Sequence, residues 1–187
     1  MFESLRGHFL IAGCRLKDRN FFKTAVLIVE HSPEGAMGLV INRPSSVSVA
    51  NALSGHLDLP DTEELVYVGG PVEPAALFIL HNAANLDPGE AAVLSSIYVG
   101  SSADIFEEVV RSAIADSDIR FRIYSGCAGW GPGQLEGELA RGDWMTLKAT
   151  EDAIFCEDPY QVWDQLLARV YATHRLLPHV TENPELN

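Results

Sequence analysis

The segment TAVLIVEHSPEGAMGLVIN, residues 24–42, decides the fold class, because it joins a buried strand, a turn and a returning strand. Thr24–Glu30 is a continuous apolar run rich in β-branched residues, which is typical of a strand buried on both faces. Pro33 presets φ at the second position of a turn, and Gly35 supplies its exit. Gly38–Asn42 then returns as a second strand. The segment predicts an antiparallel hairpin, and a hairpin excludes a purely parallel sheet.

The rest of the chain alternates between strand and helix patterns, without an internal repeat or a linker that would divide it. Helices mixed with hairpins predict an α/β (α+β mixed) fold, with helices on a bent, mixed sheet. We expect one compact domain over residues 1–178 and a loose polar tail over 179–187. Strands are expected at Gly7–Ala12, Leu65–Val68, Ala76–His81, Ser96–Val99, Ile119–Tyr124 and Trp144–Leu147, and helices at Val47–Leu53, Asp104–Ile114, Gly133–Ala140 and after Asp158.

Three local features make specific predictions about burial and boundaries. Asp104–Ile114 has apolar residues at helical spacing, including Ile105 and Ile114, and we expect them on the buried face of a helix. Ile119–Tyr124 alternates apolar and basic residues, which is typical of a half-exposed strand. Pro44 is expected to end the strand before it, because proline cannot donate a hydrogen bond to a neighbouring strand.

The charge of the chain narrows its possible partners. Among 187 residues, 13 are Lys or Arg and 26 are Asp or Glu, so the net charge is −13. This charge repels phosphate backbones and anionic lipids, so we expect neither nucleic acid nor a membrane as a direct partner. No stretch approaches the ~18–20 apolar residues of a membrane span, and the first residues lack the pattern of a signal peptide. Cys14, Cys127 and Cys156 are odd in number and widely spaced, so a reducing cytoplasm is expected.

Glycine-rich turns after three predicted strands suggest one ligand site. The segment YSGCAGWGPGQLEGE, residues 124–138, is expected to run from a strand through a glycine loop into a helix, an arrangement that binds anions. Arg43 could clamp a carboxylate or phosphate, and Gly69–Gly70 follows another strand. If these strand ends converge, they form one cleft for an anionic small molecule or an acidic segment of a partner. Its candidate ligand-binding residues are Asn42, Arg43, Gly69, Gly70, Gly126, Gly129, Trp130 and Gln134.

Each of these features also has a structural interpretation. The glycine loop could be a tight turn that lets Trp130 pack on the core, and Arg43 could pair with one of the many acidic residues. Cys127 could be a nucleophile near a helix start, but a small buried residue is favoured. Glu30 and His31 could do acid–base work, although a solvated turn is the simpler interpretation. No spacing of histidines and cysteines indicates zinc, and nothing indicates a cofactor.

Four blocks of the sequence, taken together, resemble the YqgE/AlgH family of bacterial proteins. They are GHFLIAGCRLKDRNFFKTAVLIVEH (7–31), GAMGLVINRP (35–44), VYVGGPVE (66–73) and GCAGWGPGQLEGEL (126–139), and they span nearly the whole chain. The resemblance implies a single α/β unit with a mixed, strongly bent sheet and no established biochemical activity. One family member carries a label as a regulator of alginate gene expression, which implies regulation without a mechanism. Cys127 stands where the family usually has an aromatic residue, so a reaction that needs this thiol would not be a family reaction.

These observations favour a non-enzymatic cytoplasmic protein that regulates or binds, acting through a protein partner or an anionic small molecule. The helix predicted at 104–114 carries more acidic than basic residues, so it is no recognition helix for DNA, and any effect on transcription would be indirect. The alternative is an enzyme acting on a phosphorylated or carboxylated metabolite, with Glu30 or His31 as the acid–base group. The enzyme hypothesis requires His31 to reach the cleft at Arg43.

Overall fold

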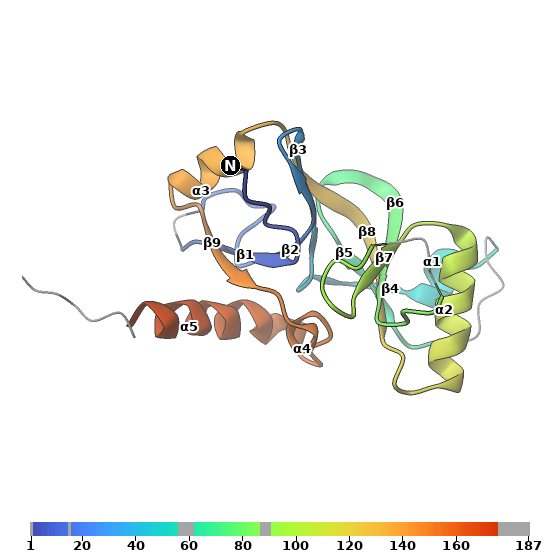
Figure 1. Cartoon of the computed structure of the whole chain (residues 1–187). Coiled ribbons are helices and arrows are strands. Elements are labelled where there is room, and N and C mark those ends of the chain that lie inside the picture. The colour runs from blue at the N-terminus through green and yellow to red at the C-terminus, as the bar shows by residue number, and fades with distance from the viewer. Residues whose placement is uncertain (1, 15, 56–61, 87–90, 176–187) are drawn as a thin grey trace, which may run out of the picture.

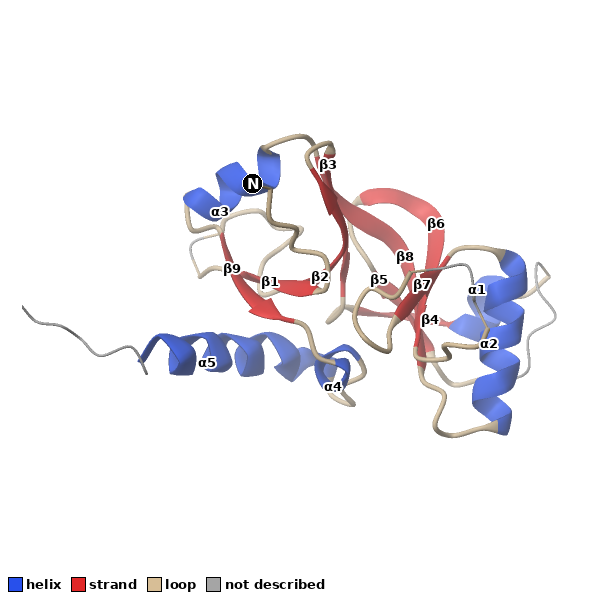
Figure 2. Ribbon diagram, in the orientation of Figure 1, coloured by secondary structure: helices blue, strands red, loops and turns tan. Residues whose placement is uncertain are grey.

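A computed structural model describes residues 2–14, 16–55, 62–86 and 91–175 (Figure 1). The tail predicted at 179–187 lies outside these residues. The described chain forms a mixed α/β domain, as predicted (Figure 2). The strands are β1 (His8–Ala12), β2 (Ala25–Ser32), β3 (Gly35–Val40), β4 (Pro44–Ser48), β5 (Leu65–Val68), β6 (Val72–His81), β7 (Tyr98–Gly100), β8 (Phe121–Trp130) and β9 (Trp144–Lys148). The helices are α1 (Val49–Leu53), α2 (Ala103–Ala115), α3 (Gln134–Ala140), α4 (Glu151–Ile154) and α5 (Val162–Arg175), with the short 3₁₀ turn η1 (Pro159–Gln161) before α5.

The nine described strands form one open sheet in the order β4-β5-β8-β3-β2-β1-β9, with β6 also paired to β8 and β7 paired to β6. β5 runs parallel to β8, whereas the other pairs are antiparallel, so the sheet is mixed, as expected. β8 is the shared strand: β5 and β6 flank its first half, and β3 pairs with its last residues. The sheet therefore has two parts that meet along β8 (Figure 1).

The hairpin predicted from residues 24–42 is confirmed as the antiparallel pair β2–β3. Its register runs from Val26 opposite Val40 to Ser32 opposite Gly35, so the turn is Pro33–Glu34, shorter than expected. The residues Ala25–Val29 are all buried, as expected for a strand covered on both faces. The pairing shifts between Ile28 and Glu30, which marks a bulge before the turn.

β8 contradicts two of the predictions. The chain stays extended through Gly126 and Gly129 to Trp130, so the expected glycine loop is reduced to the residues between Trp130 and α3. Gly126 is needed inside the strand, because the neighbouring backbone at Gly70 and Val72 approaches too closely for a side chain. The strand is also not half-exposed, because Phe121, Arg122, Ile123 and Tyr124 are all buried.

The bend of β8 rests on direct backbone contact. Gly126 has a positive φ of 70°, a conformation that glycine adopts without strain. A Cβ added to Gly69 would lie 2.2 Å from the Gly126 oxygen, and one added to Gly70 would lie 2.2 Å from the Cys127 carbonyl. The Gly69 amide also donates to Ser125 O at 2.9 Å. The segment between β5 and β6 is thus packed against the bend with no space for side chains.

The helices cover both parts of the sheet. α5 packs on β1, β2 and β9, and α3 on β3 and β9, around the larger core. α1 and α2 close a second core on β5, β6 and β8. Phe106, Val109 and Val110 of α2 are buried as predicted, but Ile114 is 55% exposed because it lies at the end of the helix, beyond the core. Pro44 begins β4 instead of ending a strand; it is the first residue of an edge strand, where a missing N–H is tolerated.

The contact between the glycines predicts a sharp difference between two Gly→Ala substitutions. Gly69→Ala is expected to lower the free energy of unfolding by about 3 kcal/mol, because its methyl group overlaps the backbone of β8. Gly131→Ala is the matched control, since an added Cβ there has nothing within 4 Å, and it should change stability by less than about 0.5 kcal/mol. Urea denaturation of both variants measures the difference; equal stabilities would show that the close packing at Gly69 is not required.

Candidate functional site

Asn42 and Arg43 direct their side chains at the loop that precedes β2. The buried Asn42 accepts a hydrogen bond from Ala25 N at 2.9 Å and donates one to Lys23 O at 3.0 Å. The Arg43 guanidinium donates to the carbonyls of Asn20 and Phe22, the latter at 3.1 Å. Both residues thus satisfy backbone groups of an irregular segment. These bonds occupy the amide of Asn42 and much of the donor capacity of Arg43.

Gly69, Gly70 and Gly126 come together, but as backbone packed on backbone. The Arg43 carbonyl also accepts from Val68 N at 2.8 Å, so the strand ends do converge. No volume for a ligand remains between them, because even a methyl group would overlap the backbone. Four cavities among the described residues, of about 720, 450, 360 and 170 Å³, are not lined by Asn42, Arg43, Gly69, Gly70 or Gly126.

Trp130 and Gln134 belong to a cluster built on the Glu138 carboxylate. Trp130 and Trp144 donate their indole N–H groups to Glu138 Oε2 at 2.9 and 2.8 Å, and Gln134 donates to Oε1 at 2.9 Å. Phe21 packs against both indoles, with ring centroids 6.2 and 5.4 Å away. Partial burial alone raises the pKa of Glu138, but the hydrogen bonds from Trp144, Gln134 and Trp130 outweigh it, so this pKa lies below its ordinary value. Through these hydrogen bonds, the Glu138 carboxylate links α3 to Trp130 of β8 and to Trp144 of β9.

A small cavity of about 170 Å³ opens beside this cluster. Gly129, Trp130 and Gln134 line it, together with Glu138 and the Arg141–Asp143 ion pair, whose N–O distance is 2.8 Å. Arg141 already has Asp143 as its counter-ion, and the hydrogen bonds of Glu138 come from within the cluster. The three predicted residues therefore share one cavity, and its polar groups mostly bind each other.

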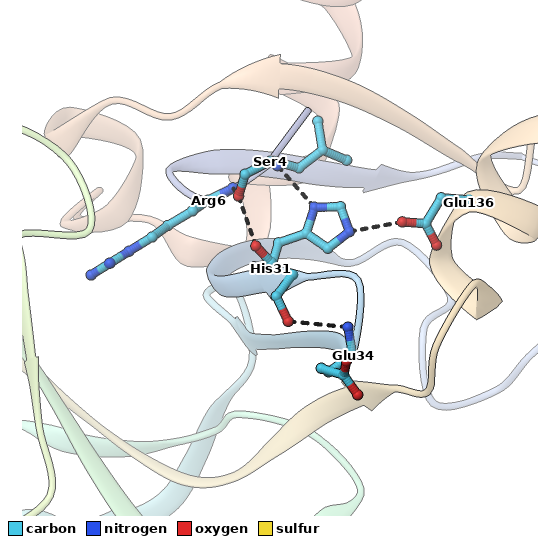
Figure 3. A network of polar contacts seen from close by, with 7 residues as sticks. Ser4, Arg6, His31, Glu34 and Glu136 are labelled. Atoms are coloured by element: carbon cyan, nitrogen blue, oxygen red, sulfur yellow. Dashed lines mark hydrogen bonds and ion pairs between the residues drawn. The ribbon is translucent and has the colours of Figure 1, made fainter. Parts of the chain in front are cut away.

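His31 is held between the N-terminal segment and α3 (Figure 3). Its Nδ1 accepts from Leu5 N at 2.9 Å, which places the ring proton on Nε2, 3.0 Å from Glu136 Oε1. Ser4 Oγ donates to the His31 carbonyl, and the Phe2 ring meets the imidazole edge-on. The His31 side chain is only 3% exposed, whereas Glu30 is exposed. His31 contacts a cavity of about 450 Å³ that also contains Arg6 and Glu34, but both of its ring nitrogens are engaged.

Cys127 is buried in the wall of the larger core. Burial raises the pKa of its thiol, and the nearby Glu73 carboxylate raises it further. A nucleophilic cysteine needs the opposite shift, because the thiolate is the reactive form. The interpretation of Cys127 as a small buried residue is therefore the one its environment supports.

The largest of the four cavities lies elsewhere, with a volume of about 720 Å³. We call it the arginine cavity. It is lined by Arg120, directly before β8, and by Arg122 within β8, together with residues of β5, the end of α2 and the segment between α4 and η1. Side chains two residues apart in an extended chain point the same way, so both guanidiniums reach the same space. The lining residues are Pro44, Thr62–Leu65, Tyr67, Ala113, Ile114, Ser117, Ile119–Arg122, Phe155, Glu157, Pro159 and Tyr160.

Arg122 is a buried cation, with 7% of its surface exposed. Its guanidinium donates to the carbonyls of Ile154 and Cys156 and stacks on the Tyr67 ring at 4.6 Å. The partly buried Arg120 donates to Phe155 O at 2.6 Å and lies over the Phe155 ring. Among the described residues, no carboxylate oxygen lies within 4.0 Å of either guanidinium. Two arginines thus share one cavity without a counter-ion from the described chain.

The arginine cavity could not be predicted from local sequence patterns, for a physical reason. The alternation of Arg120 and Arg122 with apolar residues looks like a solvated strand face. Both arginines instead bind the carbonyls of residues 154–156, a segment that is distant in sequence and that covers them. The sequence feature that could have indicated this site is its charge, because two arginines lie two residues apart in a chain of net charge −13.

The described residues contain no group of three His, Cys, Asp or Glu side chains arranged to hold a metal ion. Nor does any helix in the described part of the chain have both the length and the apolar character needed to cross a membrane.

Comparison with known proteins supports the predicted family. The family described as AlgH-like matches residues 9–175. A UPF0301 protein of Chlorobium limicola is 31% identical over 188 residues, covering 100% of this chain and 98% of the relative; one of Myxococcus xanthus is 35% identical and covers 88% and 90%. The solution structure of the AlgH protein from Pseudomonas aeruginosa matches with a TM-score of 0.68 and 33% identity, over 91% of this chain and 93% of that one. A crystal structure of a Corynebacterium diphtheriae protein, 23% identical, has the same fold, with a TM-score of 0.72 over 90% and 88%.

The depressed pKa of Glu138 predicts how stability depends on pH. Because its folded-state pKa lies below the unfolded value of about 4.3, ionised Glu138 stabilises the fold above that pH, and the contribution is lost as the pH falls. Glu138→Gln is expected to lower stability at pH 7 by about 1–3 kcal/mol. It should also flatten the decrease between pH 5 and pH 3, as measured by urea denaturation at each pH. Parallel pH profiles for the two proteins would contradict this role.

The His31 contact predicts local protection of the N-terminal segment. His31→Ala removes the acceptor of the Leu5 amide, so hydrogen exchange at Leu5 should accelerate about fivefold. The Gly7 amide is an internal control, because it bonds to Ile28 O, not to His31. Equal acceleration at both amides would indicate loss of the whole segment's packing and not of one acceptor.

Proposed function

The chain belongs to the AlgH-like family, and from that premise we propose that it is a binding protein that holds a small anion in the arginine cavity. Any regulatory effect would come through this ligand or through a partner protein that responds to it. The proposal keeps the anionic ligand expected from the sequence and moves its site from the glycine turns to Arg120 and Arg122.

The buried charge of Arg122 is the observation that carries the proposal. A charge that has left water without a counter-ion is costly, and backbone carbonyls offset that cost only in part. An anion in the cavity would supply the missing negative charge directly beside both guanidiniums. A guanidinium binds carboxylates and phosphates through paired N–H donors, which adds geometric selection to the charge.

Both arginines retain donors for a ligand. A guanidinium has five N–H groups. Arg122 uses two hydrogen bonds on Ile154 and Cys156, and Arg120 uses one on Phe155. These bonds also orient the guanidiniums before a ligand arrives, and such preorganisation favours binding because less freedom is lost.

The enzyme alternative has less support from the geometry. His31 lines a different cavity from Arg120, and its hydrogen bonds to Leu5 and Glu136 leave neither ring nitrogen free. In the arginine cavity, burial raises the pKa of Tyr67, although the charge of Arg122 opposes the shift, so this phenol is poorly suited to proton transfer near neutral pH.

Direct binding of nucleic acid remains disfavoured in this proposal. Arg120 and Arg122 line a cavity, and exposed Glu63, Glu64 and Glu157 line it with them. A phosphate backbone would meet this negative rim before the guanidiniums. A regulatory effect in the cytoplasm, such as the one named for a family member, would therefore be indirect.

The proposal predicts that binding of simple anions depends on Arg120. Acetate and inorganic phosphate, titrated at constant ionic strength, should raise the melting temperature; an anion at 100 times its Kd would add about 2.7 kcal/mol of stability. Arg120→Gln is expected to raise the Kd at least about tenfold through loss of a charge-assisted hydrogen bond.

Arg169→Gln is the matched control, because Arg169 is exposed on α5 outside the cavity. It should leave the anion effect unchanged. Equal loss in both variants, or no anion effect in the unmodified protein, would contradict the proposed function.

A further inference from the structure

The mouth of the arginine cavity carries exposed apolar side chains. Leu65, Ile114 and Tyr160 line the cavity and are 38%, 55% and 74% exposed. They come from β5, the end of α2 and η1, so three separate elements place an exposed apolar side chain around one opening. Ile114 follows the buried helical pattern of α2, yet it projects beyond the core to this site. Single exposed apolar residues are ordinary, but a cluster above a charged floor indicates a binding surface.

The same mouth carries negative charge. Glu63, Glu64 and Glu157 line the cavity and are exposed. A ligand with a second anionic group away from the arginines would place that group near these carboxylates. Like charges repel at this range, so the rim selects against ligands that carry a second anionic group away from the arginines.

We propose that the ligand is a small amphiphilic carboxylate: one carboxylate held by Arg120 and Arg122, on an uncharged apolar body that covers Leu65, Ile114 and Tyr160. This inference rests on the proposed function, and it adds the chemical class of the ligand. The cavity volume of about 720 Å³ falls in the range of ~300–1,000 Å³ usual for small-molecule sites. In this proposal, the arginines recognise the carboxylate of the ligand, and the exposed apolar residues of the rim recognise its apolar body.

Three probes separate these two contributions. Acetate supplies the carboxylate alone, octanoate adds an apolar chain, and octanedioate adds a second carboxylate at the far end of that chain. Each methylene removed from water should tighten binding about three- to fourfold. Calorimetric titration at constant ionic strength is expected to give octanoate a Kd at least tenfold below those of acetate and octanedioate, with one site per chain.

Exposed rim residues offer variants that should fold normally. Tyr160→Ser and Ile114→Ser should each weaken octanoate at least threefold and leave acetate unchanged. Tyr171→Ser is the matched control, because Tyr171 is 50% exposed on α5 and does not line the cavity. Glu157→Gln should reduce the preference for octanoate over octanedioate.

The outcomes distinguish the two proposals. Acetate and octanoate binding with equal affinity, both lost in Arg120→Gln, would leave the anion site in place and overturn the amphiphilic ligand. Octanoate binding that survives Arg120→Gln would overturn the inference, because the carboxylate would then not be recognised. Binding of none of the probes would overturn the proposed function and this inference together.

Discussion

The close contact of backbones at the bend of β8 is the constraint on which the rest of the structure depends. Gly69 and Gly70 lie so near Gly126 and Cys127 that no side chain fits between them. This contact lets β8 pair with β5 and with most of β6 before the bend, and with Val72 of β6 and with β3 after it. One strand therefore belongs to both parts of the sheet, and every helix takes its position from one part or the other. The arginine cavity is lined by the first residues of β8 and by the segment that leads into α5.

Arginine side chains satisfy the backbone carbonyls of irregular segments in this structure, as hydrogen bonds between neighbouring strands do in the sheet. Arg43 binds carbonyls of the loop before β2, and Arg120 and Arg122 bind carbonyls at the end of α4. Each use moves positive charge from the surface into the molecule. In a chain of net charge −13, the Arg122 guanidinium is thereby withdrawn from the surface and held at the arginine cavity. This separation explains how an acidic protein can offer a site for an anion.

Local patterns predicted the fold well, whereas contacts between distant segments decided the site. The hairpin at 24–42 and the helix after Asp158 follow from apolar runs, turn residues and a cap that act within a few residues. The extension of β8 through Gly126 could not be predicted in this way, since its glycines signal a loop unless the neighbouring backbones are known. The same limit hid the burial of Arg122, which depends on Ile154 and Cys156. The cleft predicted from the glycine turns included Trp130 and Gln134, but the carboxylate that joins them, Glu138, is identified only by the packing of α3.

The late position of β8 in the chain also has a consequence for synthesis. β3, β5 and β6 all precede it, and each must wait for residues 121–130 before its partner β8 exists. The other edge of β1, away from β2, stays open longer still, because β9 forms from residues 144–148. A nascent chain leaves the ribosome from its N-terminus, so several strand edges are open while most of the protein has already been made. Unpaired edges invite association with other chains. The risk of misassembly is therefore greatest before residues 121–130, which form β8, have been synthesised. The speed of translation up to that point then affects how efficiently the chain folds.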